Sequence, residues 1–204
     1  MKLKMIVAMT KNLGIGINNT IPWYCKEDLK RFSLLTKGSG KNAIIMGKNT
    51  YLSLPKPLKY RDNIVLSTSL KAKKNKVFSA TSMRKVIPHL YKYDNVYLIG
   101  GERVYNEYID SDQVKGIYHT HIEEDYECDT FFPEIPEKFN KINTARFKDV
   151  DKLNNKDVFF DVNLYVNSEY NGDCTDDKLI NNFNRTLRKM RVHHNIYDYD
   201  PLDS

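Results

Sequence analysis

The chain has few cysteines and lacks long hydrophobic runs. Cys25, Cys128 and Cys174 are scattered over 204 residues and never form a C-x-x-C pair, which argues against a disulfide framework and a zinc knuckle. No apolar stretch approaches the ~18 to 20 residues that a membrane span needs. Residues 1–4 lead directly into a predicted strand, with no signal peptide. We therefore expect a cytoplasmic protein with reduced thiols and no membrane association.

The charge is unbalanced but does not identify a partner. Thirty-two basic and 26 acidic residues give a formal net charge of +6 and a pI near 9.0. Such an excess suits nucleic acid, and it equally suits an anionic metabolite drawn in by electrostatic steering. Composition alone leaves both interpretations open.

Hydrophobic patterning indicates an α/β fold. Residues 5–8, 43–46, 64–66 and 96–99 are apolar at successive positions, as in strands of a parallel sheet covered on both faces. Helices are predicted at 26–36, 48–53, 81–91 and 101–109, and further strands at 114–122, 139–147 and 158–166. The last two strands suit an antiparallel hairpin at the sheet edge. The segments 14–23 and 123–138 are predicted to be loops.

The chain divides near residue 167. Residues 1–167 are predicted to form the catalytic domain. Residues 168–204 form a polar tail with a basic amphipathic helix, in which Leu179, Phe183 and Leu187 share a face behind the capping candidates Thr175 and Asp176. The tail has three possible roles, as an interdomain linker, a packing element, or a docking and dimerisation helix.

One carboxylate lies on an apolar helix stripe. Asp28, Phe32 and Leu35 are spaced i, i+4 and i+7 and therefore share a face, with Leu29 beside them. The simpler interpretation is that Asp28 only stabilises the helix N-terminus, a role that suits Glu27 better. A carboxylate in an apolar cleft instead favours a partner with paired donors, such as an aminopyrimidine edge.

Two glycine-containing segments follow predicted strands. Residues 46–50 contain Gly47, Lys48 and Thr50, and residues 99–105 contain the pair Gly100–Gly101. Backbone N–H groups at such helix starts can bind phosphate, although a glycine pair is also compatible with a plain tight turn. The G-x-G at 14–16 lacks the third glycine of a dinucleotide fingerprint, and plain loop geometry is the favoured interpretation of it.

Two further segments bear on cofactor and metal. Ser67, Thr68 and Lys71 follow the third strand without an acidic residue for a free ribose, which favours NADPH over NADH. His119 and His121 share a strand face, but no third ligand is spaced to join them, so no metal is expected.

These blocks together resemble the dihydrofolate reductase family over residues 3–167. The resemblance is carried by Ile15-Gly16, Ile21-Pro22-Trp23, Asp28-Leu29-x-x-Phe32, Met46-Gly47-Lys48-Asn49-Thr50, Arg61-Asp62-Asn63, Ile99-Gly100-Gly101 and Asp129-Thr130-Phe131-Phe132-Pro133. The segment 126–135 is similar to reductase halves of bifunctional reductase/thymidylate synthase chains. The family implies a mixed, mainly parallel eight-stranded sheet with flanking helices, and NADPH-dependent reduction of 7,8-dihydrofolate to tetrahydrofolate.

The resemblance also implies a set of site residues. Asp28 would anchor the pterin, Thr120 would hold Asp28, and Trp23 would hold a water near the ring. Arg61 would bind the substrate's glutamate carboxylate, and further substrate contacts would come from Ile6, Val7, Ile21, Leu29, Phe32, Leu54, Leu58 and Ile99. Cofactor contacts would come from Ala8, Ile15, Gly16, Gly47, Lys48, Asn49, Thr50, Ser67, Thr68, Ile99, Gly100, Gly101, Glu102, Arg103, Val104 and Tyr105. Antifolates are implied ligands. Lys48 replaces a frequent arginine, and a point charge grips the 2′-phosphate less firmly than a fork.

Two other functions compete with this one. A pyrimidine reductase of the riboflavin pathway resembles this fold and uses NADPH, but Asp28 after Pro22-Trp23 argues against it. Nucleic-acid binding through the basic helix near 178–194 has only charge and amphipathicity in its favour. The tail also leaves open association with a thymidylate synthase, or self-association.

Overall fold

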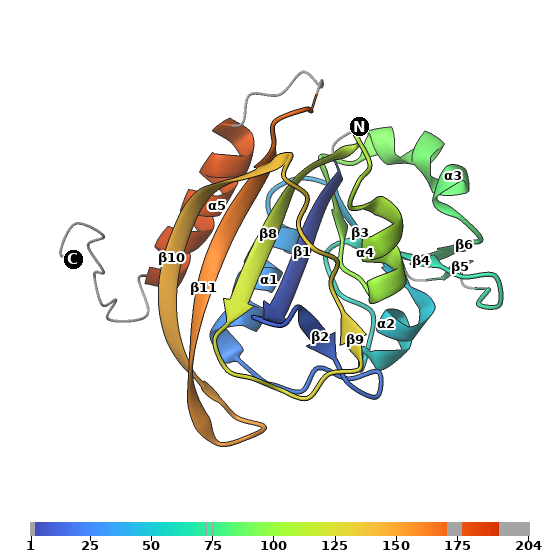
Figure 1. The fold of residues 1–204 in the computed structure, drawn as a ribbon. Helices are drawn as coiled ribbons and strands as arrows, with labels where there is room; N and C mark the ends of the chain where they lie inside the picture. Colours follow the sequence, from blue (N-terminus) through green and yellow to red (C-terminus); the bar gives the residue numbers. More distant parts are fainter. Residues whose placement is uncertain (1–2, 72, 75, 171–176, 192–204) are drawn as a thin grey trace.

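A computed structural model of the protein describes residues 3–71, 73–74, 76–170 and 177–191. Within these residues, nine strands form one sheet in the order β10-β11-β8-β1-β7-β3-β4-β6-β5 (Figure 1). The strands are β1 (Leu3–Thr10), β3 (Asn42–Gly47), β4 (Asp62–Leu66), β5 (Lys73–Lys74), β6 (Val77–Ala80), β7 (Asn95–Leu98), β8 (Val114–Ile122), β10 (Phe139–Asp151) and β11 (Lys156–Asn167). The predicted mixed, mainly parallel sheet is confirmed, with the two-residue β5 added at its edge.

The central strands pair in parallel, and helices cover both faces of this part of the sheet. β1 pairs with β7 and β8, β3 with β4 and β7, and β4 with β6, all in parallel. Ala43, Ile44, Ile45 and Met46 of β3 are all fully buried, as a strand between two layers requires. β10 and β11 form the predicted antiparallel hairpin at one edge.

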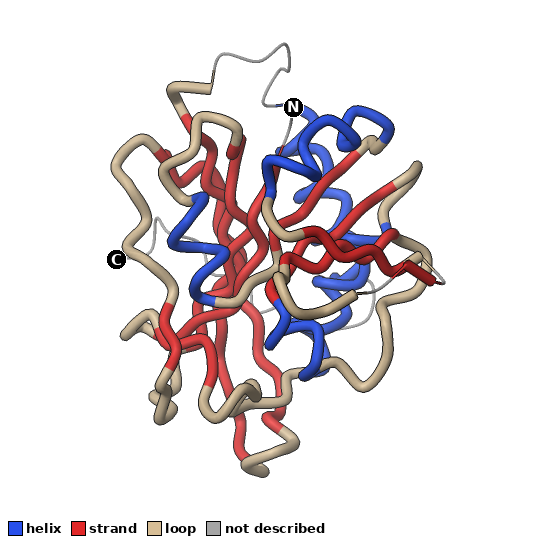
Figure 2. Tube along the Cα trace, turned by 90° about the vertical axis from the view of Figure 1, so that its right-hand side faces the viewer, coloured by secondary structure: helices blue, strands red, loops and turns tan. Residues whose placement is uncertain are grey.

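Two hydrophobic cores lie on opposite faces of the sheet. One contains Ile6, Tyr118 and Leu35 of α1 (Lys26–Lys37), together with apolar residues of α5 (Asp177–Arg191). The other contains Met5 and Val7 and packs under α3 (Met83–Val86), the 3-10 helix η1 (Ile87–Lys92) and α4 (Glu102–Tyr108). The layers are seen along two perpendicular directions in Figures 1 and 2.

Two local predictions were wrong. Part of the segment 14–23 is not loop, because β2 (Gly14–Gly16) pairs with β9 (Thr130–Phe131), a strand inside the other predicted loop. These strands are too short to show hydrophobic alternation, and long-range hydrogen bonds define them. The predicted helix 81–91 is a short α-helix that continues as a 3-10 helix, since Pro88 lacks the N–H that an α-helix interior uses.

The parallel strands bring distant segments to one edge. β1, β3, β4 and β7 end at Thr10, Gly47, Leu66 and Leu98, and their carboxyl ends lie along the same side of the sheet. β2, β9 and α2 (Lys48–Ser53) gather beside this edge, toward the bottom of Figure 1. Ligands of open α/β sheets bind outside such strand ends. No helix among the described residues is long and apolar enough to span a membrane.

Candidate active site

Asp28 lies in the first turn of α1, against the sheet. The residue is 8% exposed, and its Oδ1 accepts a 2.5 Å hydrogen bond from the Thr120 hydroxyl on β8. Ala8 of β1 is the register partner of Thr120, so the side chains of Ile6, Ala8 and Thr120 lie on the sheet face that α1 covers. Helix and sheet together hold one carboxylate in an apolar setting.

Several predicted substrate-binding residues pack against the hydrophobic core on the Asp28 face of the sheet. Phe32, Leu54, Leu58 and Ile99 are partly buried and pack against the core that holds Ile6. Ile21 and Leu29 are 54% and 42% exposed, so their apolar side chains remain available to a ligand.

Val7 differs from its neighbours because strand side chains alternate. Its side chain lies in the core on the opposite face of the sheet. Val7 could therefore contribute to the Asp28 site through its backbone only.

Arg61 is a buried cation beside Phe32. Its guanidinium carbon lies 5.7 Å from the Phe32 ring centroid, and Nε and Nη1 have no hydrogen-bond partner within the described chain. Burial lowers the pKa of Arg61 to about 10. The neighbouring Asp62 carboxylate accepts a hydrogen bond from the Tyr93 hydroxyl. Arg61 is thus a desolvated donor, and no carboxylate of the described residues bonds to its Nε or Nη1.

Asn63 holds Arg61 in place, a role that the sequence pattern did not reveal. Its side-chain amide donates to the carbonyl groups of Arg61 and Leu58, and its oxygen accepts from the Leu58 N–H at 2.9 Å. This amide fixes the loop that carries both residues, so Arg-x-Asn is a structural unit.

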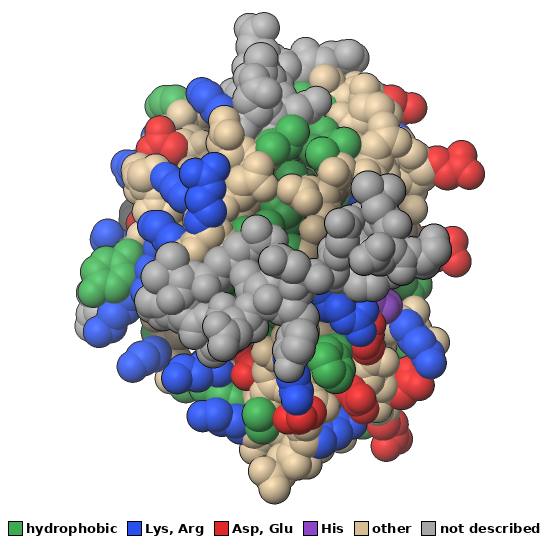
Figure 3. All heavy atoms as spheres, turned by 90° about the vertical axis from the view of Figure 1, so that its left-hand side faces the viewer, with side chains coloured by type: hydrophobic (Ala, Val, Ile, Leu, Met, Phe, Trp, Pro, Cys, Tyr) green, Lys and Arg blue, Asp and Glu red, His purple; other side chains and the backbone are tan. Residues whose placement is uncertain are grey.

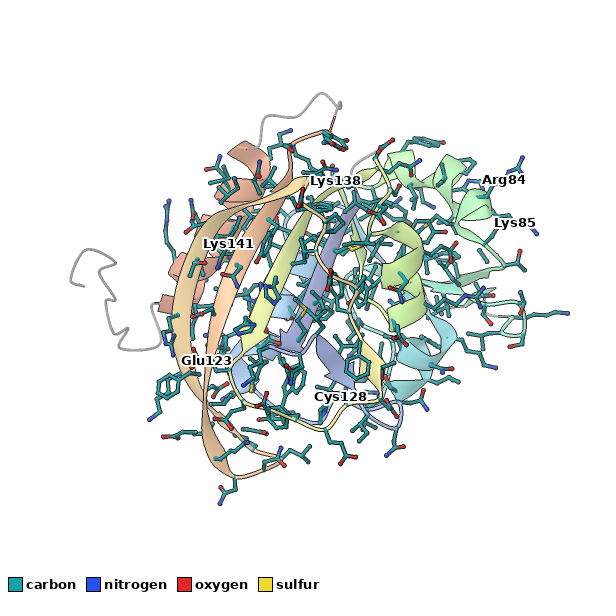
Figure 4. The ribbon with its side chains drawn as sticks, viewed as in Figure 1. Arg84, Lys85, Glu123, Cys128, Lys138 and Lys141 are labelled. Atoms are coloured by element: carbon teal, nitrogen blue, oxygen red, sulfur yellow. The ribbon has the colours of Figure 1, made fainter. Side chains whose placement is uncertain are left out.

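The loop before α1 is fixed at both ends. The Asp129 carboxylate accepts from the Asn18 N–H at 2.8 Å, and the Thr130 hydroxyl donates to the Gly16 carbonyl. Asp151 accepts from the Tyr24 N–H at 2.9 Å. Trp23, only 5% exposed, packs against Tyr126 with ring centroids 5.2 Å apart. Cys128 lies on the segment leading to β9, close to this loop (Figure 4).

The two glycine-containing segments meet at the strand ends. The Gly47 N–H donates to the Gly100 carbonyl at 2.8 Å, and a Cβ on Gly101 would lie 3.2 Å from the Thr50 hydroxyl oxygen. Gly100 has φ +107°, a conformation that favours glycine, and the Gly100–Gly101 peptide bond is cis. Gly101 immediately precedes α4, as Gly47 precedes α2. Backbone N–H groups from two helix starts therefore lie close together.

The other predicted cofactor residues are more spread out. Lys48 donates to the Ser69 hydroxyl at 2.9 Å, which joins α2 to the loop after β4, and the Ser67 hydroxyl caps that loop by accepting from the Leu70 N–H. Asn49 donates to the Asn19 side chain at 3.0 Å. Thr68 and Arg103 are exposed, and Ile15 and Glu102 are half-buried. Val104 and Tyr105 are buried, and the Tyr105 hydroxyl donates to the Ile6 carbonyl.

The two histidines of the H-x-H segment, His119 and His121, both lie on β8. The described residues contain no group of three or more His, Cys, Asp or Glu side chains that could hold a metal ion. Burial, helped by the charges of His121, Arg31 and Lys141, lowers the pKa of His119 to about 3. His119 is therefore a neutral core residue near neutral pH.

Arg31 contacts the Asp28 carboxylate, but the sequence pattern did not identify it. It lies one turn from Asp28 on α1, at i+3, and contacts both Asp28 and Thr120. A basic residue at i+3 from the Asp28 carboxylate was the available signal in the sequence, although the residues at i+4 and i+7 are apolar.

The comparisons agree with this arrangement. The sequence model of the dihydrofolate reductase family matches residues 2–164. Dihydrofolate reductase of Aedes albopictus is 42% identical over 156 residues, covering 69% of this chain and 84% of that protein. The Drosophila melanogaster enzyme is 36% identical and the Mus musculus enzyme 38% identical, covering 70% and 65% of this chain and 85% and 79% of the relatives. The chain belongs to the dihydrofolate reductase family.

Proposed function

We propose that the protein reduces 7,8-dihydrofolate to 5,6,7,8-tetrahydrofolate with NADPH, and that Asp28 anchors the pterin ring. The observation that carries this proposal is the state of the Asp28 carboxylate. Oδ1 is tied to Thr120 and Arg31, whereas Oδ2 accepts no hydrogen bond from the described residues. The free oxygen and the charge suit the paired N–H donors of a pterin's 2-amino group and N3.

Arg61 would bind the glutamate tail of the substrate, at the end opposite to the pterin. A folate carries carboxylates on its glutamate tail, and a buried guanidinium with unpartnered nitrogens is a strong receptor for one of them. Phe32 packs beside both ends, since it follows Asp28 by one turn and lies under Arg61. The apolar side chains of Leu54, Leu58 and Ile21 suit the ring system between them.

The residues at the strand ends fit a nicotinamide dinucleotide, which the family implies. A Cβ on Gly101 would fill the space beside Thr50, and a Cβ on Gly100 would lie 3.1 Å from the Tyr105 ring, so both positions need glycine. Lys48, together with Ser67 and Thr68, suits a phosphate at the adenosine end, which supports NADPH over NADH. When bound there, NADPH would supply the hydride for pterin C6.

Within the protein, Asp28 orients and polarises the ring, and a water delivers the proton to N5. Among the residues that the structure describes, no second acidic side chain is bonded to Asp28 or Thr120, so we infer that the proton comes from solvent. The loop at 14–24 lies beside the site and is held by Asp129 and Asp151, which suits it to admit and then exclude water. Trp23 would hold the water near the ring.

Loss of absorbance at 340 nm tests the proposal. Purified protein mixed with NADPH and dihydrofolate should consume NADPH and form tetrahydrofolate, methotrexate should inhibit, and NADH should be a poorer donor. The diaminopyrimidine substrate of the riboflavin-pathway reductase serves as the control and should not be reduced. A folded sample that leaves dihydrofolate unchanged would refute the proposal.

The proposed reductase domain comprises residues 1–167, and residues 168–204 form a tail. Of the roles considered for the tail, packing is best supported, since Leu179, Phe183 and Met190 are buried in the core. A cytoplasmic location agrees with Cys25 and Cys128, which are free thiols. Association with a thymidylate synthase would depend on tail residues that α5 leaves exposed.

A further inference from the structure

Arg31 is one of the largest fully buried side chains of the protein. It is 1% exposed, and its polar partners are Asp28 Oδ1, at 3.5 Å from Nη2, and the Thr120 hydroxyl. Nε and Nη1 have no hydrogen-bond partner within the described chain. A buried cation is costly unless an anion compensates it, and Asp28 is the carboxylate in contact with it.

The chemistry of the three side chains fixes the direction of their hydrogen bonds. A guanidinium only donates, so the Thr120 oxygen accepts from Arg31 and its single hydrogen points at Asp28 Oδ1, 2.5 Å away. Asp28 Oδ1 therefore receives the Thr120 hydroxyl and lies next to Nη2. This arrangement fixes Oδ1 and the plane of the carboxylate, and it leaves Oδ2 without a hydrogen bond from the described residues.

The surroundings keep water away from Arg31. Tyr118 lies next to it on β8, and the Phe183 ring of α5 stacks on Tyr118 with centroids 6.4 Å apart and planes at 13°. Burial lowers the pKa of Arg31, and the charge of Asp28 opposes that shift. The positive charge behind the anchoring carboxylate is thus both close and poorly screened.

We propose that Arg31 is a positioning and specificity-determining residue, which fixes Asp28 through Thr120 and makes the anchor nearly neutral overall. A neutral pterin needs the orientation of Oδ2 and its acceptor strength. A basic 2,4-diaminopyrimidine ring that binds as a cation gains mainly from the uncompensated charge of the carboxylate. Arg31 therefore favours pterin substrates over cationic ring analogues. This inference rests on the proposed role of Asp28.

The experiment compares two ligands in matched variants. Arg31→Met removes the charge with little change in volume, and Lys30→Met removes a charge from the next position of the same helix, where Lys30 contacts Glu27 rather than Asp28. Dissociation constants for folate and methotrexate can be read from the fluorescence of Trp23, the single tryptophan. The NADPH dissociation constant and the thermal midpoint report on folding.

Arg31→Met should weaken folate binding about tenfold and raise the ratio of the folate to the methotrexate dissociation constant by about tenfold or more. Lys30→Met should leave the ratio unchanged. Arg31→Lys keeps the charge but loses the fork, so it should weaken folate while the ratio stays near that of the wild type. Packing loss alone would weaken both ligands together and leave the ratio constant.

An unchanged ratio in Arg31→Met would overturn the inference. Should that variant not fold, Arg31→Gln, which is neutral and can still donate to Thr120, must show the same rise, and a constant ratio there would be equally contrary. The ratio is measured by binding, so it is independent of turnover. Failure of the wild type to reduce dihydrofolate would refute the proposed function, whereas normal turnover with a constant ratio would refute only the role of Arg31.

Discussion

Charged residues of this site are defined by burial and by partners that lie far away in sequence. Asp28 could be picked out from its apolar stripe, and Arg31 follows it by three residues on the same helix, but the geometry of the Thr120 contact depends on the register of β8 against β1. Arg61 was likewise found by its motif, while the amide of Asn63 that holds it was not. Sequence reasoning finds residues with the right chemistry, and the fold decides which of their atoms are free.

For a single residue, the substitution Asp28→Asn tests the proposed role of Asp28 in binding the pterin ring. The amide keeps the shape but loses the charge, so kcat/KM for dihydrofolate at pH 7 should fall by about two orders of magnitude. Part of the loss should be recovered at low pH, where the substrate arrives already protonated. Steady-state rates across pH 5 to 8 measure this, and near-normal activity at pH 7 would contradict the assigned role.

His119 makes stability depend on pH. Its pKa is about 3 in the folded protein and near the ordinary 6.5 when unfolded, so the unfolded chain binds the extra proton between these values. The free energy of unfolding should therefore fall as pH drops from 6.5 toward 3, by up to about 1.4 kcal/mol per pH unit from this residue. Urea titrations should show a shallower pH dependence in His119→Gln. The control variant His89→Gln changes an exposed histidine of η1 and should keep the wild-type slope. Equal slopes in the wild type, His119→Gln and His89→Gln would contradict the account.

Among the elements, α5 shows what periodicity can predict and what it cannot. The spacing of its apolar residues correctly indicated an amphipathic helix, because a 3.6-residue repeat is a local property. Its partner could not be read from the chain: Phe183 stacks on Tyr118 and the helix packs beside α1. The short β2–β9 pair was missed for the same reason, since two or three residues carry no repeat.

Phe183→Ala should therefore destabilise the whole catalytic domain. The side chain is 1% exposed, and removing a buried phenylalanine leaves a cavity that costs about 3 kcal/mol. Chemical denaturation measures the change. Arg188→Ala, on the exposed face of the same helix, should change stability by less than about 0.5 kcal/mol. A Phe183→Ala protein as stable as the wild type would mean that α5 does not pack on the sheet.

The proposed cofactor site between the starts of α2 and α4 can be tested by a substitution at Gly101. In Gly101→Ala the new Cβ would lie 3.2 Å from the Thr50 oxygen and occupy the side from which a pyrophosphate would approach. We expect NADPH affinity to fall about tenfold, or about 1.4 kcal/mol, while folate affinity stays the same. Fluorescence titration with each ligand measures both constants, and equal losses for the two ligands would contradict a cofactor-specific role.

At the level of the whole molecule, charges of both signs lie on the described surface, and several basic side chains are paired with carboxylates. The face in Figure 3 carries lysine and arginine side chains mainly on its left and acidic side chains toward its lower right. Ion pairs such as Lys148 with Asp157 and Lys156 with Glu124 offset part of the charge on β10 and β11. This mixture, with the buried cations Arg31 and Arg61 at the site, favours an anionic metabolite over nucleic acid.

The central claim is that one site passes hydride from NADPH to the pterin ring anchored by Asp28. Its most direct test is a single turnover with NADPH that carries deuterium at both C4 positions, followed by magnetic resonance analysis of the product. The wild type should yield tetrahydrofolate with one deuterium at C6, and Asp28→Asn should form the same product far more slowly. Tetrahydrofolate without deuterium at C6, or no product from a folded wild-type protein, would contradict the account.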